Sequence, residues 1–226
     1  MISTPLYTHL VASFAFTLSF TGCVEMGAER LNDVSRDAWQ KPQGVVEHLS
    51  VIPGSRVADL GAGEGYFTWY LAKAVGTRGT VFAVDINPEA VDRIFKEMVA
   101  RGTPNVRPIQ AKLDNPRLPD PVDLVFSSNT YHLMNNRAAY FRSLASSLRP
   151  GGRVAILDFH PRGFLSGLFG DRISKEDVRR EMEAAGYRLI NDYDLLERQH
   201  FQIFAMAGTE PSESSHYTDP STKDPE

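Results

Sequence analysis

A glycine-rich turn and two carboxylates are the part of this chain whose chemistry is clearest. The turn at 61–65, Gly-Ala-Gly-Glu-Gly, follows an apolar run whose second-last residue is Asp59, and Asp85 ends another run 20 residues after the turn. Glycines at such a turn allow positive φ angles and let a ligand approach the backbone closely. A carboxylate at position 85 can accept hydrogen bonds from both hydroxyls of a ribose, and Asp59 can attract a cationic group. These residues predict a site for a ribose-bearing ligand.

The spacing of the glycines distinguishes between two classes of ligand. They follow the pattern G-x-G-x-G. The fingerprint of NAD-binding domains, G-x-G-x-x-G, would require a glycine at the position that Tyr66 occupies. The sequence therefore disfavours an NAD-dependent oxidoreductase.

Polar side chains that could act as acids or bases follow two later apolar runs. Tyr131 and His132 come shortly after the run at 122–127, and Asp158 ends the run at 153–158. The imidazole group, with its usual pKa near 6.5, suits a general base. These three residues are therefore the candidates for catalysis.

The same residues have alternative, structural roles. His132 could hydrogen-bond the start of a helix at Asn135-Asn136 instead of acting as a base. His160, which precedes a proline, is expected to cap a loop, and Asp158 could orient that loop without touching an acceptor.

Short apolar runs predict the strands that must position these residues. Four of them have the near-continuous apolar character of strands buried on both faces, at 56–60, 80–85, 122–127 and 153–158. A weaker strand at 105–110 contains Pro108, which places it at or near a sheet edge. The last two strands, at 187–192 and 200–207, are joined by a connection too short for a crossover helix, so they should form an antiparallel hairpin.

Helical patterns separate these strands. The segment from Asn87 to Gly102 has the caps of a helix, and its apolar face is formed by Val91, Ile94, Phe95, Met98 and Val99. A second helix is expected over 137–148, and a third is opened by Ser174 and ends at Gly186. This alternation predicts an α/β fold, with a doubly wound and mostly parallel sheet of seven strands that ends in the antiparallel hairpin.

Over residues 36–207 the chain resembles the class I S-adenosylmethionine-dependent methyltransferases. The motifs that carry the resemblance are D-L-G-A-G-E-G at 59–65, A-V-D-I at 83–86 and L-R-P-G-G-R at 148–153, together with the antiparallel last strand. Segments at 36–42, 114–119, 130–132 and 156–159 are similar to a bacterial subgroup of predicted methyltransferases. The resemblance implies a Rossmann-like fold and S-adenosylmethionine as co-substrate, without a metal.

The resemblance also implies roles for individual residues around the glycine turn. The residues that would line the methionine and ribose portions of the co-substrate are Gly61, Ala62, Gly63 and Gly65. Asp59 would reach the methionine amine through water, and Asp85 would bind the ribose diol.

Four further residues are assigned to the co-substrate in the same way. Ile86 would stack on the adenine, and Leu113 and Asp114 match the loop that reads the adenine amino group. Asn129 would offer its backbone carbonyl to the methionine amine.

Charge and one departure from a motif bear on the methyl acceptor. Residues 128–131, Ser-Asn-Thr-Tyr, differ from the [DNS]-P-P-[YFW] motif of enzymes that methylate amide or adenine amino nitrogens. The net charge of −4 and the pI near 5.9 argue against nucleic acid as a partner. We therefore expect a small-molecule acceptor, methylated by in-line displacement. A catalytically silent module that only binds S-adenosylmethionine is the alternative.

Two segments could close over such an acceptor. The segment at 160–174 contains three glycines among apolar residues, as expected of a lid, although it could also be a permanently packed loop. Arg36, Trp39 and Gln40 could complete the lid, or Trp39 could simply pack against the domain.

The N-terminal segment is expected to direct export. Residues 10–20 form an uncharged run that is too short to span a bilayer but has the length of a signal-peptide core. The four residues at 20–23, Phe-Thr-Gly-Cys, resemble the lipobox of bacterial lipoproteins and include the only cysteine of the chain. Residues 1–22 would then be cleaved, leaving Cys23 lipidated and the protein anchored to the extracytoplasmic face of a membrane.

Three further expectations concern the ends of the chain. Residues 24–35 would form a tether between the anchor and the domain at 36–207. Translation from Met26 would instead give a cytoplasmic protein. The polar and acidic segment at 208–226 is predicted to be a disordered tail.

Overall fold

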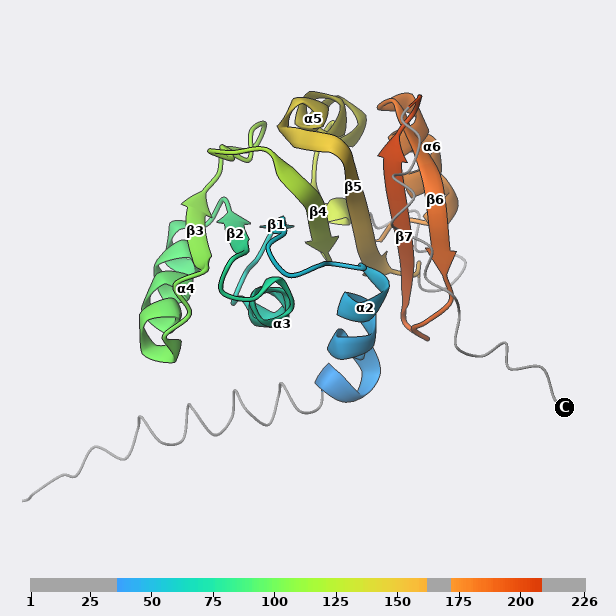
Figure 1. Ribbon diagram of the computed structural model, residues 1–226. Helices are drawn as coiled ribbons and strands as arrows, with labels where there is room; N and C mark the ends of the chain where they lie inside the picture. The colour runs from blue at the N-terminus through green and yellow to red at the C-terminus, as the bar shows by residue number, and fades with distance from the viewer. Residues whose placement is uncertain (1–35, 162–171, 209–226) are drawn as a thin grey trace, which may run out of the picture. The chain divides into compact units, whose positions relative to one another are not determined.

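Seven strands form one mixed sheet in the computed structural model, which describes residues 36–161 and 172–208 (Figure 1). The strands are β1 (Arg56–Leu60), β2 (Thr80–Asp85), β3 (Val106–Gln110), β4 (Val122–Ser128), β5 (Leu148–Phe159), β6 (Tyr187–Tyr193) and β7 (Gln199–Met206). They lie in the order β3-β2-β1-β4-β5-β7-β6. Strands β1 to β5 are parallel, and β7 is antiparallel to both of its neighbours. The predicted fold class is confirmed.

Some of the predictions fall outside the described residues. They are the signal segment, the lipidated Cys23 and the tether, all within residues 1–35, most of the lid at 160–174, and the tail from residue 209 onward. No helix among the residues that the structure does describe is long and apolar enough to cross a bilayer.

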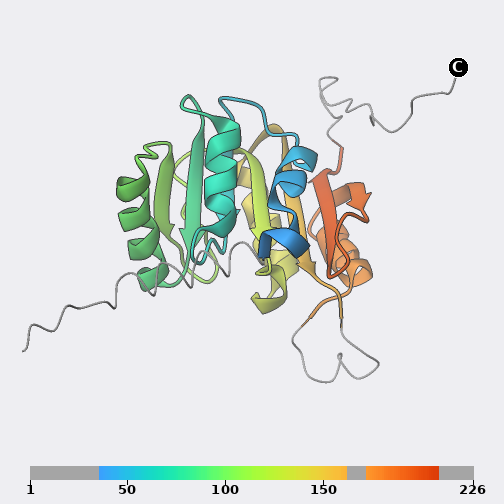
Figure 2. The same cartoon turned by 90° about the horizontal axis from the view of Figure 1, so that it is seen from below.

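Helices cover both faces of the sheet. They are α2 (Pro42–His48), α3 (Tyr66–Val75), α4 (Pro88–Arg101), α5 (Arg137–Leu144) and α6 (Lys175–Ala184), with the short 3-10 helices η1 (Tyr131–Leu133) and η2 (Ala145–Ser147). α2, α3 and α4 lie on one face, and α5 and α6 on the other (Figures 1 and 2). Because successive side chains of a strand point to opposite faces, Val57 belongs to the first of these two cores and Ala58 to the second.

The predicted helix ends are confirmed where their signals are local. The side chain of Asn87 accepts a hydrogen bond from the backbone N–H of Glu89 at 2.9 Å, and Gly102 ends the same helix with a φ of 61°. Ser174 caps α6 by accepting the backbone N–H of Asp177 at 3.1 Å. Pro108 lies in β3, which is an edge strand as predicted.

Two helix predictions were wrong in part. The helix expected over 137–148 ends at Leu144, because Leu148 already pairs with Val122 as the first residue of β5. Phe95 and Val99, expected on the buried face of α4, are 55% and 65% exposed. This helix packs on β2 and β3 at the edge of the sheet, so only a narrow stripe that includes Ile94 is covered.

The topology brings the candidate residues to one edge of the sheet. β1, β2, β4 and β5 run in the same direction, so their carboxyl ends lie together. The chain crosses from one side of β1 to the other between β3 and β4, and such a switch point leaves a crevice at the carboxyl ends of the strands.

Candidate functional site

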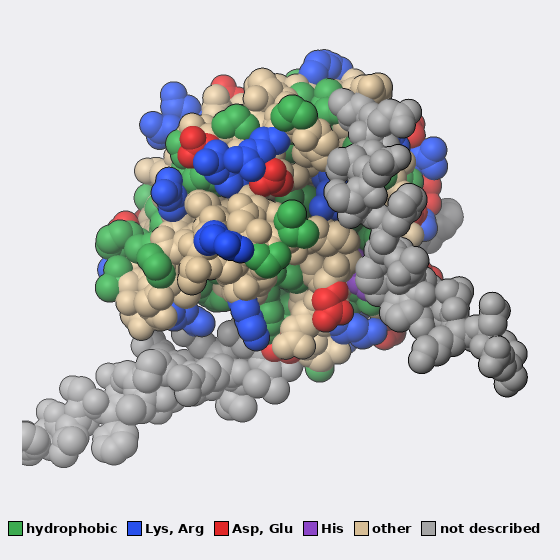
Figure 3. Space-filling model, viewed as in Figure 1, with side chains coloured by type: hydrophobic (Ala, Val, Ile, Leu, Met, Phe, Trp, Pro, Cys, Tyr) green, Lys and Arg blue, Asp and Glu red, His purple; other side chains and the backbone are tan. Residues whose placement is uncertain are grey.

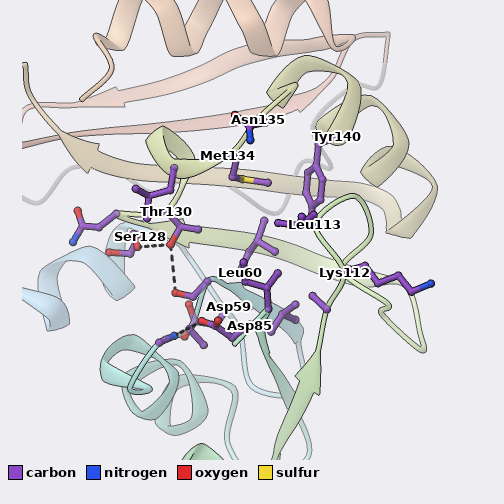
Figure 4. Close-up of a pocket in the computed structure, with 18 of the residues that line it drawn as sticks. Asp59, Leu60, Asp85, Lys112, Leu113, Ser128, Thr130, Met134, Asn135 and Tyr140 are labelled. Atoms are coloured by element: carbon purple, nitrogen blue, oxygen red, sulfur yellow. Dashed lines mark hydrogen bonds between the residues drawn. The ribbon is translucent and has the colours of Figure 1, made fainter. Parts of the chain in front are cut away.

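A cavity of about 840 Å³ opens at this edge, a size in the usual range for small-molecule sites. Nine of the ten residues predicted to bind the co-substrate line it: Asp59, Gly61, Ala62, Gly63, Asp85, Ile86, Leu113, Asp114 and Asn129. Figure 4 shows the carboxylates of Asp59 and Asp85 on one side of the cavity, and Met134 and Tyr140 on the other. The tenth residue, Gly65, does not line it and instead caps the N-terminus of α3.

The glycine turn has a backbone that side chains would disrupt. Gly61, Gly63 and Gly65 have φ angles of 76°, 56° and 81°, in the left-handed region that favours glycine. A Cβ on Gly61 would also lie 2.2 Å from Oγ1 of Thr130. A Cβ on Gly63 would meet no atom within 4 Å, so the backbone there faces open space. Glycine at 61 therefore allows Thr130, which follows β4, to approach closely, and glycine at 63 leaves the backbone accessible to a ligand.

Asp85 is held by the backbone around it. One carboxylate oxygen accepts the N–H of Gly63 at 2.8 Å, and the other accepts the N–H of Asn87 at 2.9 Å (Figure 4 draws the bond to Gly63). A carboxylate has about four acceptor positions, so each oxygen can still accept another hydrogen bond. The side chain of Asp85 is thus fixed in place and still has free acceptor positions for hydrogen bonds from a ligand.

Asp59 is a buried acid in the wall of the cavity. Its side chain accepts a hydrogen bond from the hydroxyl of Thr68 at 2.6 Å, and the residue is only 2% exposed. Burial raises the pKa of this carboxyl group to about 6, while the bond from Thr68 and the positive charge of Arg36 oppose the rise. A cation bound in the cavity would stabilise the ionised form.

The helical residues 36–40 add a positive charge to the cavity. Arg36 lines the cavity, and its guanidinium lies 3.7 Å from the ring centroid of Tyr66. The Nε atom of Arg36 donates to the side chain of Gln40, which is fully buried and donates to Ser128 of β4 at 3.4 Å. Arg36 is therefore held at the site by contacts with β4 and α3.

Trp39 does not take part in the cavity. Its ring stacks on Phe159 with a centroid distance of 5.8 Å, and Trp39 is not among the cavity-lining residues. This is the packing role that the sequence left open as the alternative.

Apolar side chains surround the mouth of the cavity. Ile86, Leu113 and Leu133 all line it, and Leu113 and Leu133 are 82% and 71% exposed. Met134 and Tyr140 extend the apolar lining on the α5 side. No signal in the sequence indicated that Met134 or Tyr140 would line a cavity, because an apolar residue in a loop or on a helix does not reveal whether it faces a cavity.

His132 and Asp158 are paired. The Nδ1 atom of His132 lies 2.7 Å from one carboxylate oxygen of Asp158, and the backbone N–H of His132 donates to the other at 3.1 Å. Asp158 is fully buried. The alternative bond from His132 to Asn135-Asn136 is not formed. Both residues lie beside the cavity wall made by Thr130, Leu133 and Met134, although neither lines it.

Tyr131, predicted as catalytic, points away from the cavity. It is fully buried, its ring lies 5.3 Å from that of Phe141, and its hydroxyl donates to Glu181 of α6 at 2.9 Å. A 3-10 helix has three residues per turn, so the three side chains of η1 point in directions about 120° apart. Tyr131 therefore enters the core while His132 faces β5, and this geometry favours a structural role for Tyr131 over the predicted catalytic one.

His160 lies at a loop junction, in keeping with its expected role. Its backbone N–H donates to the carbonyl of Arg198 at 3.1 Å, and its carbonyl accepts from Arg172 at 3.2 Å. Across residues 36–161 and 172–208, no group of His, Cys, Asp and Glu has a geometry that could hold a metal ion.

Comparison with known families identifies the domain that carries this cavity. Residues 57–152, which extend from β1 into β5, match the model of a family described as a methyltransferase domain. Over these residues the chain is thus similar to a methyltransferase domain. The enzymes of this class use S-adenosylmethionine as methyl donor.

Curated relatives of this methyltransferase domain act on chemically different acceptors. The chain is 32% identical over 153 residues to an arsenite methyltransferase of Halobacterium salinarum, covering 62% of this chain and 39% of the relative. It is 31% identical over 155 residues to the ubiquinone/menaquinone biosynthesis C-methyltransferase UbiE of Azotobacter vinelandii, covering 66% of this chain and 58% of the relative. The chain thus spans about half the length of the relatives that it matches.

Solved structures share the fold of this domain. A methyltransferase from Aquifex aeolicus described as SAM-dependent superposes with a TM-score of 0.69 at 24% identity, covering 78% of this chain and 95% of that one. An arsenic(III) S-adenosylmethionine methyltransferase from Chlamydomonas reinhardtii gives a TM-score of 0.56 at 23% identity, covering 71% of this chain and 67% of that one. At these identities the likeness supports the fold.

The residues of the cavity fit S-adenosylmethionine. This molecule carries an ammonium, a sulfonium and a ribose, and the cavity offers the buried acid Asp59 for positive charge and the unsaturated acceptors of Asp85 for hydroxyls. The turn at Gly63 leaves room beside the backbone, as a close-lying ligand requires. The observed geometry thus suits the methyl donor of the domain class.

Proposed function

We propose that this protein transfers the methyl group of S-adenosylmethionine to a small-molecule acceptor by in-line displacement. The observation that carries the proposal is that two unlike carboxylates, Asp59 and Asp85, lie beside an open glycine turn in one cavity. Sheet packing requires neither carboxylate. The pair matches the ammonium and the ribose of the donor.

The chain's own residues would act mainly by positioning. When bound, the donor supplies an electrophilic methyl group on a sulfonium centre. Asp59 and Arg36 provide opposite charges for the two charged groups of the methionine end, and Asp85 fixes the sugar. Holding the donor in one orientation beside the acceptor is the main source of acceleration in a displacement of this kind.

The acceptor is proposed to be an organic molecule with an apolar surface. The exposed side chains of Ile86, Leu113 and Leu133 at the cavity mouth would cover such a surface. Arsenite, the acceptor named for one relative, is a soft species that prefers thiolate ligands, whereas the only cysteine here is Cys23, outside the domain. The chemistry of the site therefore favours the organic acceptor.

Nucleic acid is a poorer candidate. Figure 3 shows basic and acidic side chains interspersed on the face in view, without a continuous basic surface among the described residues there. The net charge of −4 points the same way. A protein that binds nucleic acid needs clustered positive charge to displace counterions from the phosphates.

Calorimetric titration and a transfer assay test the proposal together. We expect the purified protein to bind S-adenosylmethionine, to show no affinity for NAD, and to methylate a member of a panel of phenols, thiols and amines. Absence of S-adenosylmethionine binding at millimolar concentration would contradict the proposal. Binding without transfer to any acceptor would favour the silent binding module instead.

A further inference from the structure

The pairing of His132 with Asp158 fixes which nitrogen of the imidazole carries a proton. Asp158 also accepts the backbone N–H groups of His132 and Phe159, at 3.1 and 2.7 Å, so its carboxylate acts as an acceptor in every contact. An acceptor requires a donor, and Nδ1 of His132 must therefore carry its hydrogen. The neutral ring then has its lone pair on Nε2.

The free nitrogen lies on the accessible edge of the ring. The side chain of His132 is 13% exposed while that of Asp158 is fully buried, so the edge bound to Asp158 is covered. Within the described residues, Nε2 of His132 has no hydrogen-bond partner. His132 also lies between Thr130 and Leu133, which both line the cavity. His132 itself does not line the cavity, so an acceptor seated against Leu133 and Met134 would lie beside the residue that carries this nitrogen.

We propose that His132 is the general base of the transfer, that Asp158 is its positioning residue, and that the acceptor is a weakly acidic hydroxyl compound of phenol type. This inference rests on the proposed function, because it names the acceptor of the same site. The apolar rim would hold the ring of the phenol, and the dyad would lie toward its hydroxyl group.

The step balances without a further reagent. The O–H bond of the acceptor breaks, and its proton goes to Nε2 of His132. The oxygen electron pair forms the new O–CH₃ bond, the S–CH₃ bond of the donor breaks, and its electron pair remains on sulfur as S-adenosylhomocysteine. Asp158 stabilises the imidazolium ring that results, and the proton then leaves to water.

The other titratable groups around the dyad can be assigned separately. His200 of β7 lies on the same face of the sheet as Asp158, with which it pairs across the strands, and its ring faces His160 at 5.7 Å. Burial lowers the pKa of His200, so its ring is neutral at pH 7. Arg172 donates to the His160 carbonyl, and Glu181 is paired with Arg137 at 2.6 Å. His132 is therefore the member of the group with both a carboxylate partner and a free, accessible nitrogen.

Two phenols of different acidity test the proposal. 4-Ethylphenol resembles the tyrosine side chain, with a pKa near 10, and must lose its proton during transfer, whereas pentafluorophenol is already ionised at neutral pH. We expect His132→Gln and Asp158→Asn to lower kcat/KM about 10²- to 10⁴-fold for 4-ethylphenol, and less than about tenfold for pentafluorophenol.

Matched controls separate this effect from misfolding. His48→Gln makes the same substitution on α2, where the histidine ring contacts Tyr193 instead, and should leave both rates unchanged. Calorimetry should show that each variant binds S-adenosylmethionine as the wild type does. Equal losses for both phenols, or no loss for either, would overturn the proposal.

Two outcomes distinguish this inference from the proposed function. A wild-type protein that methylates benzylamine or indole but neither phenol would overturn the inference and leave the proposed function in place. A protein that fails to bind S-adenosylmethionine, or that transfers no methyl group to any of these compounds, would overturn the proposed function and this inference with it.

Discussion

Asp59 and Asp85 line the same cavity but differ in environment. Asp59 is buried against the Thr68 hydroxyl, and its pKa is raised by the loss of water. Asp85 is half-buried and accepts two backbone N–H groups, one from the glycine turn and one from the residue before α4. A buried acid is stabilised in its ionised form by a bound cation, so Asp59 suits a positively charged group. A carboxylate with fixed orientation and spare acceptor positions can accept hydrogen bonds from hydroxyl groups, so Asp85 suits a ribose.

The raised pKa of Asp59 predicts a pH-dependent affinity for S-adenosylmethionine. In the free protein Asp59 has a pKa of about 6, and a bound ammonium would lower that pKa, so binding releases a proton below pH 6. Affinity should thus change by less than about 1.5-fold between pH 6.5 and 7.5 and fall about fivefold from pH 6 to pH 5. Calorimetry over this range measures the effect.

Asp59→Asn provides the control for this pH dependence. The amide keeps the size of the side chain but cannot ionise, so affinity should be weaker near pH 7 and nearly independent of pH between 5 and 7. A variant that retained the wild-type pH dependence would show that another group is responsible.

Removal of the Asp85 carboxylate should weaken donor binding by about 1–3 kcal/mol, because ribose hydroxyls would lose their acceptors. Asp85→Ala is compared with Asp92→Ala, an exposed acid on α4 that the cavity does not include. Melting temperatures report any loosening of the glycine turn, which also contacts Asp85. A change in binding below about 0.3 kcal/mol would contradict the assignment of the ribose site.

At the scale of the element, the 3-10 helix η1 shows which features near the proposed acceptor site could be predicted from the sequence. The sequence placed Tyr131 and His132 near the carboxyl end of β4, and both lie there. It could not show their directions, because these depend on a single turn of 3-10 helix. The pairing of His132 with Asp158 joins residues 26 positions apart, so no local pattern indicates it.

Helix ends with a local signal were predictable, whereas those set by the sheet were not. The caps at Asn87 and Ser174 need only neighbouring residues and were found from the sequence. The early end of α5 depends on the pairing of Leu148 with Val122. The exposure of Phe95 depends on how far the sheet extends beneath α4. Pairing and sheet width are tertiary properties.

The contact between η1 and α6 should stabilise the folded protein and take no part in catalysis. Tyr131 donates to Glu181, and Arg137 holds the same carboxylate with bonds of 2.6 and 2.9 Å. Glu181→Gln should lower the free energy of unfolding by about 1–3 kcal/mol, since two charged hydrogen bonds lose their strength. Tyr131→Phe should cost about 1 kcal/mol. Urea denaturation measures both values.

Activity distinguishes this structural role from a catalytic one. Tyr131→Phe should retain kcat within about tenfold of the wild type. This loss is much smaller than the loss of about 10²- to 10⁴-fold expected when a general acid or base is removed. A loss of about 10³-fold in a fully folded Tyr131→Phe protein would restore Tyr131 as a catalytic residue.

At the scale of the whole molecule, the strand segments and the fold class were the most predictable properties. Apolar runs buried on both faces identified β1, β2, β4 and β5, and the short connection between the last two strands indicated the hairpin. The turn at Gly61 and the acid at position 85 then fell at one edge because parallel strands share a direction. The cavity was therefore predictable as a location, while its apolar lining by Met134 and Tyr140 was not.

The N-terminal segment carries a prediction that is independent of the fold. If residues 20–23 act as a lipobox, mass spectrometry of the mature protein from a bacterial host should find a diacylated N-terminal Cys23. Cys23→Ser should abolish the lipid and leave the protein unanchored. A mature peptide that begins at Met26 or Gly27 would contradict the prediction.

A crystal structure of the complex with S-adenosylhomocysteine tests the central claim most directly. We predict that the ribose hydroxyls will be bound to the carboxylate of Asp85, and that the homocysteine end will lie near Asp59 and Arg36, against the backbone of Gly63. A nucleoside bound elsewhere, or a crevice that stays empty at saturating ligand, would contradict the account.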